Sequence, residues 1–176
     1  MTEAEAGAGT PAPGAEIRAL LSSLDGQRRH VLGILEGLDD EALRLPVLPS
    51  GWSCLGLVRH LALDVERFWF RAVFAGDEAE IAALDETGDA WQVPSGADAA
   101  EVLDLYRTQT RLADAVVIAA TAGAPLAWWP HEQFGAPHLH TLRDVVLHVI
   151  TETACHAGHL DAARELLDGR RWLVLT

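Results

Sequence analysis

With 176 residues, of which 49% are hydrophobic, the chain is long enough for one domain with a sizeable core. Its formal net charge of -13 at pH 7 repels phosphate backbones, which argues against nucleic acid as a partner. No stretch approaches the roughly 18 consecutive apolar residues of a membrane span. The two cysteines, Cys54 and Cys155, are too few for a disulfide framework, so a cytoplasmic location is expected.

The start of the chain is rich in Ala, Gly, Pro and Glu. It contains neither the basic start nor the apolar segment of a signal peptide, so the composition predicts a disordered tail over residues 1–14. The remaining sequence shows no internal repeat and no linker between domains. We therefore expect a single domain over residues 15–176.

Apolar residues at spacings of three and four predict three amphipathic helices before the last one. These cover residues 15–38, residues 53–75 and residues 98 to about 122. Ser53 and Asp98 are natural N-caps, and Gly76 stands where the second helix ends. Between residues 39 and 52, Pro46 and Pro49 predict a non-helical connection, and residues 76–97 predict a loop with at most a short turn.

The last helix has the clearest signature. Thr141 is a plausible N-cap and Gly169 a plausible C-terminal residue for a helix over residues 142–168. An aromatic, histidine-rich connection over residues 128–140 leads into it. Because no segment alternates with the period of a strand, the sequence predicts an all-α four-helix bundle with long connections.

Two polar residues interrupt the apolar line of this last helix. Glu152 and His156, one turn apart, occupy positions where leucine is expected between Val149 and Leu160. A buried carboxylate needs a compensating partner. Glu152 could pair with His156 or with an arginine as a structural bridge, or the two side chains could grip one divalent metal ion. The helix alone leaves both readings open.

The second helix offers a third ligand in His60. Its polar residues follow one stripe opposite the apolar face. The stripe consists of Ser53, Gly56, His60, Asp64, Arg67 and Arg71. Periodicity alone favours a solvated face over a binding site for this stripe.

Two segments resemble helices of the DinB-like superfamily, in particular its mini-circle subgroup. The first is Gly51-Trp-Ser-Cys-Leu-Gly-Leu-Val-Arg-His60-Leu, followed by Glu66-Arg-Phe-Trp-Phe-Arg. The second is the last helix, which contains Glu152-Thr-Ala-Cys-His156-Ala-Gly-His159. The likeness covers nearly the whole chain in order and spacing, and it is specific in these two segments.

The resemblance implies a DinB/YfiT-like four-helix bundle with a divalent metal near one end of its core. Three histidines are the commonest ligands in the superfamily, and His60 and His156 match two of them. Glu152 stands where the third is usual, as in the similar mycothiol-dependent maleylpyruvate isomerases, which use His, Glu and His on zinc. By resemblance, His60, Glu152 and His156 are the metal ligands. Such a set leaves an open position, with zinc as the default and Ni, Fe, Mn or Co also compatible.

Other residues near these positions have functional or purely structural interpretations. His159, one turn beyond His156, is a candidate general acid or base, a residue that orients His156, or a partly exposed histidine. His148 is expected to be an ordinary polar neighbour. Asp64 could orient His60, but a surface ion pair with an arginine on its own helix is favoured. The remaining candidates are expected to pack rather than react: Cys54, Cys155, Trp128, Trp129, His131, His138 and His140.

The resemblance implies a metal-dependent thiol S-transferase. A low-molecular-weight thiol such as mycothiol or bacillithiol would be activated on the metal, while His159 handles a proton and a small electrophile reacts. The alternatives are a lyase, isomerase or cyclase step of specialised metabolism, and a non-catalytic metal-binding bundle. A small-molecule substrate is the expected partner, and the apolar width of the first two helices suggests a homodimer.

Overall fold

The computed structural model describes residues 14–86 and 88–173. Apart from Gly14, the predicted disordered tail lies outside these residues. The described part is helical and contains no strand. The elements in chain order are α1 (Ala15–Leu35), α2 (Asp40–Arg44), α3 (Cys54–His60), η1 (Leu61–Phe74), α4 (Glu78–Ala82), α5 (Ala99–Ile118), α6 (His131–Phe134) and α7 (Leu142–Asp168). The predicted all-α class is confirmed.

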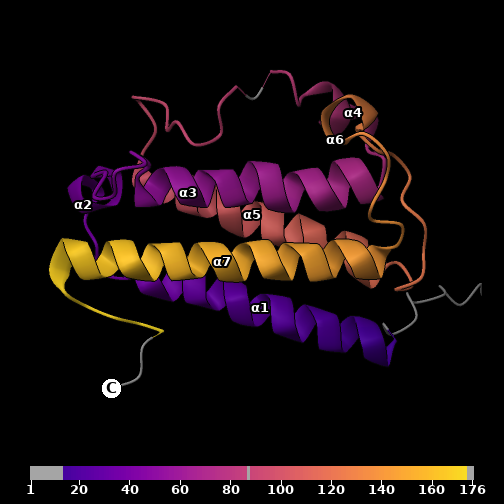
Figure 1. Cartoon of the computed structure of the whole chain (residues 1–176), viewed down its shortest axis with the longest axis horizontal. Helices are drawn as coiled ribbons and strands as arrows, with labels where there is room; N and C mark the ends of the chain where they lie inside the picture. The colour runs from indigo at the N-terminus through magenta and orange to yellow at the C-terminus, as the bar shows by residue number, and fades with distance from the viewer. Residues whose placement is uncertain (1–13, 87, 174–176) are drawn as a thin grey trace, which may run out of the picture.

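Four long helical rods form the bundle, namely α1, the continuous α3–η1 segment, α5 and α7 (Figure 1). The helix α3 continues directly into η1, so the two make one rod, which packs mainly against α5, while α1 packs mainly against α7. Figure 1 shows α1 and α7 running in one direction and the other two rods in the opposite direction. The segment after α4 therefore returns along the outside of the α3–η1 rod before α5 begins.

Helix ends follow the predicted local signals most closely in α7. The Thr141 side chain accepts a hydrogen bond from Asp144 N, and the Asp144 carboxylate accepts one from Thr141 N. Gly169 closes the helix in the left-handed conformation, at φ 78°. Asp98 and Glu101 make a similar capping box at the start of α5. These ends rest on local hydrogen bonds, which explains why the sequence alone predicts them.

Several predicted boundaries differ from the structure. The first helix ends at Leu35, two residues before Gly37 takes a positive φ of 82°, and α5 ends at Ile118. The connection predicted to be non-helical contains α2, because the Asp39 side chain caps it through Ala42 N and both prolines follow its end. Short helices α4 and α6 likewise occupy the predicted loops.

The second rod departs from a regular α-helix at Leu61. From there to Phe74 it is π-helical, so each residue advances by a smaller angle than in an α-helix. The polar stripe predicted to be solvated is instead half-buried: the side chains of His60 and Arg67 are 15% and 12% exposed. The helix α4 covers part of it through Glu80, which pairs with Arg71 at 2.6 Å.

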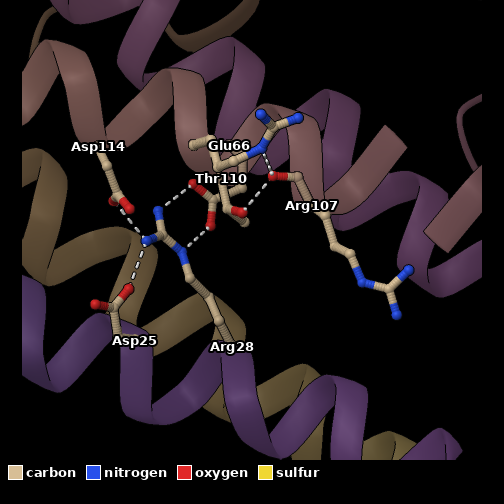
Figure 2. A network of polar contacts seen from close by, with 7 residues as sticks. Asp25, Arg28, Glu66, Arg107, Thr110 and Asp114 are labelled. Atoms are coloured by element: carbon tan, nitrogen blue, oxygen red, sulfur yellow. Dashed lines mark hydrogen bonds and ion pairs between the residues drawn. The ribbon is translucent and has the colours of Figure 1, made fainter. Parts of the chain in front are cut away.

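Glu66 of η1 lies in the core, where it is 1% exposed. The guanidinium of Arg28 on α1 donates two hydrogen bonds of 2.7 Å to the Glu66 carboxylate (Figure 2). Arg28 also pairs with Asp25 at 2.9 Å and with Asp114 of α5 at 2.7 Å. Burial raises the pKa of Glu66, and Arg28 acts in the opposite direction. This network ties α1, η1 and α5 together, and the sequence analysis did not identify it.

Among the helices of residues 14–86 and 88–173, none is long and apolar enough to cross a membrane. The homodimer was predicted from the apolar width of the first two predicted helices. The large exposed hydrophobic side chains lie elsewhere in the described part of the chain. They are Leu45, Leu112, Ile118, Phe134, Leu147, Leu166, Trp172 and Leu173. The homodimer stays a prediction.

Candidate metal centre and adjoining cavity

The three predicted ligands come from two facing rods. His60 is the last residue of α3, and Glu152 and His156 lie one turn apart on α7. The rings of His60 and His156 meet edge to face, with centroids 5.1 Å apart. The Glu152 Oε2 atom lies 3.6 Å from His156 Nε2. The fold therefore brings the two imidazoles together and places the carboxylate beside one of them.

Two neighbours fix the ring of His60. The Asp64 Oδ2 atom lies 2.8 Å from His60 Nδ1, which orients the ring and leaves its Nε2 available. Asp64 therefore contacts the candidate ligand, in preference to the surface ion pair that the sequence favoured. The indole of Trp91 stacks on the face of the His60 ring, with 4.2 Å between the centroids and an interplanar angle of 18°.

Trp91 belongs to the long connection before α5, and its place depends on α3. The side chain of Arg59 donates hydrogen bonds to the carbonyls of Asp89 and Gln92, which hold the connection on the rod. The carbonyl oxygen of Trp91 approaches Gly56 so closely that a Cβ there would overlap it. No local sequence signal identifies Trp91, because a contact between a loop and a distant helix leaves no periodic pattern.

The positions of Glu152 and His156 differ from the expectation that they lie in the middle of the apolar line. Thr153 and Ala157 occupy the fully buried line, at 0% and 1% exposure. The side chains of Glu152 and His156 stand at its edge, 40% and 13% exposed. The buried line of α7 therefore runs one residue further along the chain than predicted, through Thr153 and Ala157 in place of Glu152 and His156. The carboxylate therefore reaches solvent without a full desolvation penalty.

The environment of His156 keeps its imidazole neutral. Burial and the nearby His60 ring lower its pKa from 6.5 to about 4, against a raising effect of Glu152. A neutral imidazole has a free lone pair, as a metal ligand needs. Burial also lowers the pKa of His148, one turn before Glu152.

The donor set suits a divalent ion in kind and partly in geometry. Two imidazoles with nitrogens about 2.1 Å from one tetrahedral ion have centroids on the order of 5 Å apart, as His60 and His156 do. Across the described part of the chain, however, no three His, Cys, Asp or Glu side chains are already grouped to hold an ion. Glu152, being partly exposed, is the member with room to rotate toward the pair.

His159 contacts one of the predicted ligands, and the two cysteines differ in exposure. His159 is exposed, and its Nδ1 lies 3.4 Å from His156 Nδ1, a placement that suits orientation of the His156 ring. Cys54 is buried, and desolvation raises the pKa of its thiol to about 11, which fits the predicted packing role. Cys155 is exposed, so the prediction that it packs is wrong.

A cavity of about 400 Å³ adjoins the centre between η1, α6 and α7. Its walls combine the centre, three aromatic rings and two more histidines. The lining residues are His60, Asp64, Val65, Phe68, Trp69, Gln133, Phe134, His138, His148 and Glu152. His148 and His138 thus line this cavity, His131 lines the neighbouring one and His140 lines a third, while His131, His138 and His140 are all exposed residues. Sequence reasoning assigned no site role to Phe68 and Trp69, which it placed on the apolar face of the second helix, or to Phe134, which it placed in the connection before the last helix.

One comparison with known proteins found a match for this chain. The family model described as mycothiol-S-transferase matches residues 19–169, which is most of the chain and includes all three predicted ligands. No curated protein matches the chain. The predicted DinB-like membership is confirmed, since that family is DinB-like. The chain belongs to the mycothiol S-transferase family.

Proposed function

We propose that the protein is a metal-dependent S-transferase that joins a low-molecular-weight thiol of the mycothiol type to a small electrophile. The observation that carries the proposal is the meeting of His60 and His156 beside Glu152, with Asp64 on the far nitrogen of His60. The family match supports the thiol chemistry. Zinc is the expected metal, with His60, Glu152 and His156 as its ligands.

When bound, the ion would lower the pKa of the thiol and so supply a thiolate at neutral pH. The residues of the chain position the reaction. Asp64 and Trp91 hold the His60 ring from two sides, and His159 contacts the Nδ1 side of His156. The two imidazoles are thereby fixed before any ligand arrives, which reduces the ordering cost of binding.

The transfer itself balances without a further reactant. The thiol loses its proton to solvent, which reaches the site because the side chains of Asp64 and Glu152 are 44% and 40% exposed. The sulfur lone pair then forms a bond to the electrophilic carbon, and the leaving group departs with the bonding pair. The aromatic walls of the cavity exclude water from one side of the reacting carbon.

Metal analysis and thiol conjugation of the purified protein test the proposal together. We expect near one divalent ion per chain in the wild type, and loss of both the ion and conjugation in His60→Gln and His156→Gln. His140→Gln, which alters an exposed imidazole away from the centre, is the matched control. A metal-free wild type that conjugates mycothiol as fast as the loaded protein overturns the metal requirement. Bound metal without any thiol conjugation overturns the transferase.

A further inference from the structure

The cavity beside the candidate metal centre has one wall made of aromatic rings. Phe68 and Trp69 of η1 are 7% and 5% exposed and meet edge to face, with centroids 5.0 Å apart. Phe134 at the end of α6 completes the wall, with centroids 6.1 Å from Phe68 and 5.8 Å from Trp69. Three rings in mutual contact form a surface that suits a planar aromatic group.

Phe134 stands out because it is 41% exposed although it belongs to this wall. The residue that follows Phe134 is held in place by a hydrogen bond to a buried indole. Gly135 follows at φ 67°, and its carbonyl accepts a hydrogen bond of 3.0 Å from the indole of Trp129, which is 7% exposed. The α6 turn thus presents an apolar ring to an open cavity, and a bound ligand would cover it.

The charges around the cavity are the second constraint. No lysine or arginine lines it, and its only formally charged lining residues are the carboxylates Asp64 and Glu152. A divalent ion on His60 and Glu152 would balance the two negative charges of Asp64 and Glu152, so no net positive charge would remain to attract an anion. An anionic substrate would therefore meet no counter-ion on the protein, at an energetic cost that an uncharged substrate avoids.

A neighbouring cavity leaves room for the second substrate. It has a volume of about 830 Å³ and shares Asp64, Phe68 and Gln133 with the smaller cavity. Its remaining walls combine the polar side chains of Asp85, His131 and Glu132 with apolar ones, which are Ile81, Leu84, Trp128, Trp129 and Pro130. The larger and more polar cavity suits a hydroxyl-rich thiol, which leaves the smaller aromatic cavity for the electrophile.

We propose that the 400 Å³ cavity binds the electrophile and selects an uncharged aromatic one, with Phe134 as the main specificity-determining residue. This inference rests on the proposed transferase function. In the reaction with chlorodinitrobenzene, the thiol proton goes to solvent and a carbon–sulfur bond forms. The carbon–chlorine bond breaks, and chloride leaves with the bonding pair.

Three electrophiles test the selectivity with mycothiol and the metal-loaded protein. Chlorodinitrobenzene is aromatic and uncharged, chlorodinitrobenzoate adds one carboxylate, and iodoacetamide is small and uncharged. We expect kcat/KM, corrected for the uncatalysed rate, to be highest for chlorodinitrobenzene and at least about tenfold lower for chlorodinitrobenzoate. Equal or better turnover of the anionic compound overturns the inference.

Variants assign the effect to the wall. Phe134→Ala is expected to raise KM for chlorodinitrobenzene by about tenfold and leave KM for mycothiol unchanged, whereas Phe134→Tyr keeps the wild-type value. Leu166→Ala, which truncates a 60% exposed residue at the far end of α7, is the matched control. Gln133→Arg is expected to improve use of chlorodinitrobenzoate by supplying a counter-ion. A Phe134→Ala protein with unchanged KM values contradicts the inference.

Binding without turnover separates this inference from the proposed function. The unreactive compound dinitrobenzene should quench tryptophan fluorescence by binding beside Trp69, and Phe134→Ala should weaken that quenching by about tenfold. Quenching without any thiol conjugation supports ligand binding in the cavity and contradicts the proposed transferase function. Conjugation without saturable quenching, or quenching that Phe134→Ala leaves unchanged, removes the cavity assignment and leaves the transferase.

Discussion

The carboxylate of Asp64 and the ring of His60 form a hydrogen-bonded pair, with 2.8 Å between Oδ2 and Nδ1. The two residues lie one turn apart, on either side of the point where α3 becomes η1. A carboxylate on the far nitrogen of a metal-binding histidine fixes the ring and increases its basicity. The pair joins a partly buried aspartate to a histidine whose side chain is 15% exposed.

We therefore predict that Asp64→Ala weakens divalent metal binding by about 10–100-fold, because His60 loses the partner that orients it. Asp64→Asn should weaken it less, since an amide oxygen can still accept from Nδ1. Zinc titration with a competing chelator measures the affinity, and circular dichroism checks that the variants fold. Asp104→Ala, which alters a 71% exposed carboxylate on α5, should bind zinc as the wild type does.

The sequence predicts those parts of the molecule that depend on local chemistry. Thr141 and Gly169 delimit α7 correctly because a cap and a left-handed glycine act within a few residues. Which side chains a helix buries was predicted less well, even in the regular helix α7, where Thr153 and Ala157 occupy the buried line in place of Glu152 and His156. Glu66 was missed because its partner Arg28 stands 38 positions earlier on another helix, and no local pattern links the two residues.

Contacts between segments far apart in the sequence also limit what the sequence alone can predict. His60 and His156 were predicted to lie together from a resemblance to known proteins, and periodicity alone favoured a solvated face for His60. Nothing in the sequence around Trp91 indicates that its ring stacks on His60, because that contact depends on how the connection folds back over α3. The aromatic wall around Phe134 was missed for the same reason.

Gly56 should be indispensable for the placement of Trp91. A Cβ at this position would overlap the carbonyl oxygen of Trp91, so Gly56→Ala must push the connection away from α3. Overpacking of this kind typically lowers the free energy of unfolding by about 1–3 kcal/mol. Urea denaturation measures the loss. Gly26→Ala on α1, where a Cβ meets only the end of an arginine side chain, is the control.

Gly56→Ala should also affect the metal centre, because the Trp91 ring that it displaces stacks on His60. We expect Gly56→Ala and Trp91→Ala to weaken zinc binding, and Trp91→Phe to retain most of it, because a phenyl ring can still stack on His60. Zinc affinity in Trp91→Ala equal to that of the wild type would show that stacking does not position the ligand.

The buried pair of Arg28 and Glu66 should contribute to stability only as a pair. Glu66→Leu leaves a buried guanidinium with fewer partners, and we expect a loss of about 3–5 kcal/mol in the free energy of unfolding. Arg28→Met with Glu66→Leu should recover much of this loss. Arg107→Ala, which removes an exposed pair with Asp104, should cost at most about 1 kcal/mol. Additive losses in the double variant would contradict the pairing.

The depressed pKa of His156 predicts how stability of the metal-free protein depends on pH. Burial and the neighbouring His60 lower that pKa to about 4 in the folded chain, against 6.5 for an ordinary histidine. Between these values the unfolded chain binds a proton at His156 and the folded chain does not, so stability falls as the pH drops from about 6.5 to 4. Above pH 6.5 this residue contributes no pH dependence.

Urea denaturation of the metal-free wild type and of His156→Gln across this range isolates the effect, because the variant lacks the titrating ring. We expect the wild type to lose stability faster than His156→Gln as the pH falls, with His140→Gln following the wild type. Nuclear magnetic resonance of the His156 ring gives the pKa directly. A ring that titrates near pH 6.5 in the folded, metal-free protein would mean that His156 is more solvated than its contacts with His60 and Trp91 indicate.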